Sequence, residues 1–169
     1  MLSDQLIRIV ESHADELTRG VVRILQNSAH TPSYQAVPPE ELHRRLFEIY
    51  HDLGHWLLGD MERSVQLRYQ SLGRERCQQG IPLAEVLWAL VLIKEHLRDS
   101  VGSFLSADSV LELHREMELF RLIGRYFDRA ICCTAEAYER EAAAQREKAQ
   151  AAEARARKHF RLSSIGLTP

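Results

Sequence analysis

The positions of five prolines constrain this chain more than any other feature, because proline interrupts helices and strands alike. The prolines stand at positions 32, 38, 39, 82 and 169, so two long stretches contain none. Neither stretch shows the strict alternation of polar and apolar residues that marks an exposed strand, whereas apolar residues recur at spacings of three and four. We therefore predict an all-α fold, a bundle of about five helices, for which a globin-like arrangement is one candidate topology.

Ordinary start and stop signals bound the first four expected helices. The first covers residues 3–27, and a loop follows it that contains Asn, Ser and Pro residues. Helices over residues 38–59 and 60–80 come next, and Pro82 starts a fourth helix that reaches about Leu105. The fourth helix is apolar around most of its first half, so we expect it at the centre of the core.

The fifth expected helix is too long to lie within one compact domain. Ser109 and Glu112 have the spacing of a capping box, and no proline or turn cluster follows before Ser163. About 50 helical residues at a rise of 1.5 Å make a rod of roughly 75 Å, more than twice the width of a compact domain of this size. Part of this helix is therefore expected to project from the core.

A stripe of residues in the fifth helix has the alternating spacing of a heptad seam. Its members are Leu113, Met117, Phe120, Gly124, Phe127, Ile131, Thr134 and Tyr138. Such a stripe either packs on the domain's own helices or pairs with a second copy of the chain, and the spacing leaves both open. We expect a homodimer, with a candidate interface of Leu113, Met117, Phe120, Phe127, Ile131 and Tyr138.

Composition divides the C-terminal part of the chain from the domain, which we place at residues 1–138. From Glu139 to Lys158 no apolar side chain is larger than alanine, and alanines alternate with charges. Residues 139–160 are therefore expected to form a helical linker or a coiled coil. Apolar side chains return in residues 161–169, a tail that we expect to begin an element lying further downstream.

Charge and hydropathy limit the partners and the compartment. With 22 basic and 24 acidic residues the formal charge is −2, which provides no broad positive surface for nucleic acid. No apolar run approaches the roughly 18 to 20 residues of a membrane-spanning helix, and the charged N-terminus does not resemble a signal peptide. We expect a cytoplasmic protein without nucleic-acid or membrane partners, in which at most one of Cys132 and Cys133 faces the core.

Histidines offer the only candidate metal or haem ligands. His51 and His55 are four residues apart on one helix face, a spacing that can hold a transition metal or a haem iron. Asp52 stands where a zincin motif has glutamate, and further ligands would have to come from other helices. The leading prediction has no cofactor, with haem or a transition metal as the alternative. No motif for nucleophilic catalysis or phosphate binding is present, so we expect no enzyme.

A ligand pocket between helices is a further expectation. Trp56, Tyr69 and Trp88 are large side chains with a polar group, and bundle proteins bind ligands between their helices. We take these three residues and His96 as candidate ligand-binding residues. The competing interpretation is that they only pack in the core and at its edge.

Two segments carry a resemblance to a known family. Residues 72–87 contain the phrases Leu-Gly-Arg-x-Arg and Gly-Ile-Pro-Leu-x-Glu-Val-Leu, and residues 30–34 read His-Thr-Pro-Ser-Tyr. Over about residues 5–138 the chain resembles the N-terminal sensor domain of RsbR-type stressosome co-antagonists (the RsbRD N-terminal domain), also found ahead of histidine-kinase outputs. The resemblance implies a helical, often dimeric bacterial input domain whose C-terminal helix connects to an output domain, and it supplies no catalytic or ligand-binding residues.

These observations predict a non-catalytic signalling input domain that dimerises and transmits a signal through its C-terminal helix to a downstream output domain or partner protein. A haem- or metal-binding sensor that uses the helix histidines is one alternative. A structural dimerisation adaptor that binds no small molecule is the other.

Overall fold

A computed structural model shows an all-α protein, as predicted. It describes the backbone of residues 2–57, 62–104 and 110–165. These residues contain five α-helices, one short 3-10 helix and no strand. In chain order the elements are α1 (Leu2–Asn27), η1 (Pro32–Ala36), α2 (Pro39–Leu57), α3 (Glu62–Gln78), α4 (Leu83–Phe104) and α5 (Val110–Ile165).

The connections agree with the expected helix boundaries, with one addition. The segment after α1 was predicted as a loop but contains η1, which Thr31 ties to α1 by donating from Oγ1 to the Leu25 carbonyl at 2.8 Å. Gly80 ends α3 at φ +71°, and the Ile81 N–H donates to the Arg76 carbonyl at 3.1 Å. This is the Schellman geometry for which glycine is favoured. The predicted capping residue Ser109 lies outside the described residues.

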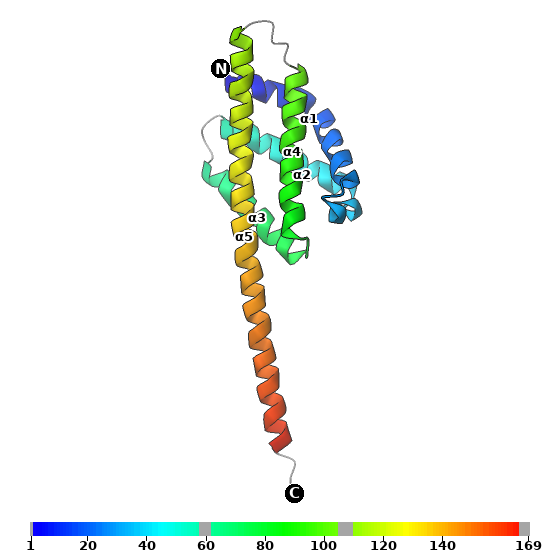
Figure 1. Cartoon of the computed structure of the whole chain (residues 1–169), viewed down its shortest axis with the longest axis vertical. Helices are drawn as coiled ribbons and strands as arrows, with labels where there is room; N and C mark the ends of the chain where they lie inside the picture. Colours follow the sequence, from blue (N-terminus) through cyan, green and yellow to red (C-terminus); the bar gives the residue numbers. More distant parts are fainter. Residues whose placement is uncertain (1, 58–61, 105–109, 166–169) are drawn as a thin grey trace.

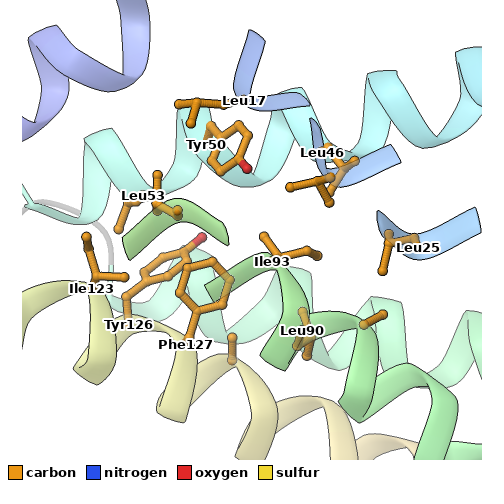
Figure 2. Close-up of a cluster of buried hydrophobic side chains, with 14 of the residues drawn as sticks. Leu17, Leu25, Leu46, Tyr50, Leu53, Leu90, Ile93, Ile123, Tyr126 and Phe127 are labelled. Carbon is orange, nitrogen blue, oxygen red and sulfur yellow. The ribbon is translucent and has the colours of Figure 1, made fainter. Parts of the chain in front are cut away.

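One hydrophobic core joins all five α-helices and η1. Figure 2 shows its centre, where Leu17 of α1, Tyr50 and Leu53 of α2, and Tyr126 and Phe127 of α5 converge. Burial of this many large side chains is the main stabilising contribution in a domain of this size. Cys133 also faces the core and Cys132 is exposed, as the 100° between adjacent helix positions predicts.

The prediction that α4 occupies the centre of the core is only partly right. α4 packs against α1, α3 and α5, but its outer face leaves Trp88 41 % exposed. α5 has more neighbours, because it contacts all four other α-helices. The apolar residues in the first half of α4 are therefore not all in the core. Some of them, such as Leu87 and Val91, are only half-buried at the sides of the helix.

α5 both packs in the core and projects from it. Its first half runs alongside α4, and its second half extends alone below the rest of the molecule (Figure 1). At 56 residues α5 is about 84 Å long. The helix continues without a break past residue 138 and as far as Ile165, so the expected tail at residues 161–169 begins within it.

Candidate functional site

The first turns of α5 carry large apolar side chains that the described parts of the domain leave exposed. Val110 is 86 % exposed, Leu113 51 % and Met117 62 %. Phe120 follows on the same side, half-buried, with the Arg98 guanidinium 5.2 Å from the centroid of its ring. We call Val110, Leu113, Met117 and Phe120 the α5 apolar stripe. Adjacent exposed side chains of this size are typical of an interaction surface.

The rest of the predicted interface packs on the domain itself. Phe127 is fully buried, so it is a core residue and is not available to a partner. Ile131 packs against the core, and the Tyr138 hydroxyl donates to the Ile81 carbonyl at 2.9 Å. The reason is helical drift: a seam of period 3.5 rotates by about 20° per heptad on a straight helix. The stripe that begins on the outside of α5 therefore turns towards α3 and α4.

α3 and α5 approach each other closely at Gly73. A Cβ atom added there would overlap the Thr134 carbonyl oxygen and lie 3.0 Å from the Tyr138 backbone nitrogen. The two backbones therefore meet with no side chain of α3 between them. Gln78 donates to Glu141 at 3.1 Å further along the same pair of helices.

On its other side α3 borders a cavity of about 400 Å³ between α2, α3 and α4, which we call the inter-helix cavity. Aliphatic side chains line much of it: Leu25, Leu42, Leu46, Ile49, Leu90 and Ile93. Four of these, Leu25, Leu46, Leu90 and Ile93, are labelled in Figure 2, where they come from α1, α2 and α4. The size and lining are those of a small-molecule site.

Charged side chains also line this cavity. Arg45 pairs with Glu41 at 2.8 Å and with Glu75 at 3.5 Å, and Arg68 pairs with Glu48 at 3.2 Å. These two arginines are therefore neutralised by neighbouring carboxylates.

Arg76 is the exception among the arginines that line the cavity. It is 3 % exposed, donates from Nη1 to the Gln79 side-chain oxygen at 2.7 Å, and lies 5.4 Å from the Tyr34 ring centroid. Its Nε has no hydrogen-bond acceptor, and no carboxylate forms an ion pair with it among the described residues. Burial lowers the pKa of Arg76 and raises that of the Tyr34 phenol, because both charged forms lose hydration.

The structure separates the residues that we predicted to bind a ligand. Tyr69 lines the inter-helix cavity, and its hydroxyl lies 3.0 Å from that of Tyr126. Trp88 stacks on His30 at the surface, with ring centroids 4.0 Å apart. His96 lines a different hollow, between α1 and α4, where burial lowers its pKa and the Leu17 carbonyl and Asp99 oppose that shift. The side chain of Trp56 lies outside the described residues.

The side chains of His51 and His55 also lie outside the described residues, so the structure does not place them as ligands. Among the side chains that are described, no three His, Cys, Asp or Glu residues gather in a way that could hold a metal ion. No described helix has the length and apolar character needed to cross a membrane.

The two segments that carry the family resemblance meet at the inter-helix cavity. Ser33 donates to Glu85 from its backbone nitrogen at 2.7 Å and from Oγ at 3.1 Å, which fixes η1 against the start of α4. Tyr34 of the first segment lies against Arg76 of the second. The sequence analysis did not identify Tyr34 or Arg76 as site residues, although Arg76 stands in the Leu-Gly-Arg-x-Arg phrase. The signal that could have identified Arg76 is a basic residue at a helix position that faces the core.

Comparison with known proteins supports the family resemblance that these two segments carry. The family model described as the RsbT co-antagonist protein rsbRD N-terminal domain matches residues 11–163, which is most of the chain. No curated protein and no solved structure matches the chain.

Proposed function

Since this chain belongs to the family of RsbT co-antagonist protein rsbRD N-terminal domains, a family of stressosome-type signalling and regulatory domains, we propose that it is a non-catalytic signalling input domain. In this proposal two copies pair along α5, and α5 carries the signal to an output domain or partner protein. The domain acts in the cytoplasm and needs no cofactor for pairing.

The observation that carries the proposal is the α5 apolar stripe. Val110, Leu113 and Met117 are exposed at the start of α5, a helix of 56 residues that continues past the far end of the packed domain. A second copy that covers these side chains would remove their apolar surface from water, at about 25 cal/mol per Å² buried. Symmetric pairing of identical stripes is the commonest way in which soluble proteins form dimers.

Transmission through α5 needs two discrete packings of the same helices, because a signal shifts an equilibrium only by its differential affinity for two states. α5 is suited to this role since it contacts every other α-helix and also extends past all of them. A change in packing on α3 or α4 would therefore reach the projecting segment directly (Figure 1). Helix shifts of this kind are a known form of switching.

Light scattering coupled to size exclusion tests the pairing. We expect the protein to elute as a dimer at micromolar concentration, and Leu113→Glu combined with Met117→Glu to make it monomeric, because buried unpaired carboxylates oppose association. Leu67→Glu is the matched control, since Leu67 is a comparably exposed leucine on α3, away from the stripe. This control should remain dimeric.

A monomeric wild type would refute the proposed pairing. An absorption scan of the same peak tests the haem alternative, because a Soret band would make His51 and His55 the leading ligands and the domain a haem sensor. A colourless dimer supports the proposal as stated.

A further inference from the structure

The inter-helix cavity is lined by a guanidinium that forms no ion pair with a described carboxylate. Arg76 is 3 % exposed, and it forms no ion pair with a carboxylate in the described parts of the chain. Arginine stays protonated in proteins, and a buried charge that is left uncompensated is strongly destabilising. Buried polar groups in proteins nearly always have a hydrogen-bond partner, and where the protein supplies none, a bound ion or ligand can do so.

The groups around Arg76 supply only part of what it needs. The Gln79 amide oxygen accepts one hydrogen bond at 2.7 Å, and the Tyr34 ring offers its face at 5.4 Å. Both are neutral, because burial raises the pKa of the phenol. The carboxylates of Glu41 and Glu75 act on Arg76 through space, but both form their ion pairs with Arg45, at 2.8 Å and 3.5 Å.

The remaining walls of the cavity select the rest of the ligand. Leu42, Leu46, Ile49, Leu90 and Ile93 are aliphatic, and the volume of about 400 Å³ accommodates an alkyl chain. A phosphate-bearing ligand would want several free cations, whereas Arg45 and Arg68 are already paired. A single guanidinium without an ion pair, beside aliphatic side chains, is complementary to a ligand that has one carboxylate and an apolar chain.

We propose that the inter-helix cavity binds a small aliphatic carboxylate, with its carboxylate group at Arg76 and its chain among the aliphatic side chains of α2 and α4. The site does not depend on pairing along α5. Its occupancy as the stimulus of the domain, by contrast, rests on the proposed function.

Isothermal titration calorimetry with decanoate, and with decan-1-ol as the uncharged analogue, tests the site on the full chain. We expect decanoate to bind more tightly than decan-1-ol. Arg76→Met keeps an apolar stem and removes the charge, so it should weaken decanoate binding by about tenfold or more and leave decan-1-ol unaffected. Arg74→Met makes the same change at an exposed position of α3 and should bind decanoate like the wild type.

A second variant tests the site even if Arg76→Met does not fold. Ser71→Phe places a large ring at the partly exposed edge of the cavity and should block decanoate by steric exclusion. Absence of decanoate binding to the wild type would overturn the inference, and so would equal binding of decanoate and decan-1-ol. A monomeric protein that binds decanoate through Arg76 would refute the pairing and leave this site standing.

Discussion

At the scale of single residues, Gly73 is the position where one added carbon should matter most. The Cβ atom of an alanine would overlap the Thr134 carbonyl oxygen, which is backbone and cannot rotate away. We expect Gly73→Ala to lower the free energy of unfolding by about 1 to 3 kcal/mol, the usual cost of overpacking. Urea denaturation followed by circular dichroism measures this.

Gly124 provides the matched control for that substitution. It lies in α5, and a Cβ atom there has no neighbour within 4 Å. Gly124→Ala should therefore stabilise the helix by about 0.5 to 1 kcal/mol, because alanine loses less backbone entropy on folding. If the two variants lost the same stability, the close approach of α3 and α5 would not be the cause.

His96 should make stability depend on pH. Burial lowers its folded-state pKa below the ordinary 6.5, so the unfolded chain binds more protons as the pH falls past that value. The stability that neutral His96 contributes is present above pH 6.5 and is lost as the pH falls through the folded-state pKa. Asp99 on α4, and Glu16, Arg19 and Arg23 on α1, are the charged groups around it.

His96→Gln removes this titration and should flatten the dependence. Urea denaturation at pH 7.5 and at pH values below 6.5 compares the two proteins, after the value at pH 7.5 has established that the variant folds. The wild type should lose more stability than the variant over the same pH range. Parallel losses would show that the protonation of His96 does not differ between the folded and unfolded states.

Residues differ in how far the sequence predicts their roles. The inward position of Cys133 follows from helix geometry, because adjacent positions differ by 100°. The burial of Arg76 does not follow, since it depends on η1 placing Tyr34 against the guanidinium. Arginine is mostly exposed in proteins, so composition argues against such a site.

At the scale of elements, α5 consists of a packed half and a free half. Ala137 is buried and Tyr138 donates to Ile81, whereas every residue from 145 to 157 is exposed. A chain that ends at residue 144 should therefore unfold with the same free energy as the full chain. A chain that ends at residue 136 should lose about 1 to 3 kcal/mol, from the burial and the hydrogen bond removed.

Urea denaturation monitored by circular dichroism, with the signal expressed per residue, separates these outcomes. A marked loss in the longer of the two truncated chains would mean that residues 145–169 contribute to the fold through contacts other than those described.

Helix extents were predictable because proline, glycine and capping signals act locally. The Gly80 stop and the Pro82 start illustrate this, since both depend only on backbone geometry. The inward turn of the heptad seam was not predictable, because a spacing of three and four does not tell an internal partner from an external one. Phe127 shows the consequence, being part of the domain's own core.

At the scale of the whole molecule, the all-α architecture and the projecting helix could be predicted, but the inter-helix cavity could not. The cavity depends on how α2, α3 and α4 are arranged, and crossing angles arise from packing between segments far apart in the chain. Of the expected ligand residues whose side chains are described, only Tyr69 reaches it, because Trp88 lies on the outer face of α4 and His96 lines a different hollow.

The contact at Gly73 makes α5 a lever. The fulcrum is the backbone-to-backbone contact at Thr134, and the arm from there to Ile165 is about 46 Å long at the rise of an α-helix, with residues 145–157 exposed. A tilt of about 5° at the fulcrum would move the tip by about 4 Å, since a rigid helix of this length carries a rotation undiminished. A displacement of α3 too small to disturb the core would thus arrive at the far end as a movement as large as a side chain.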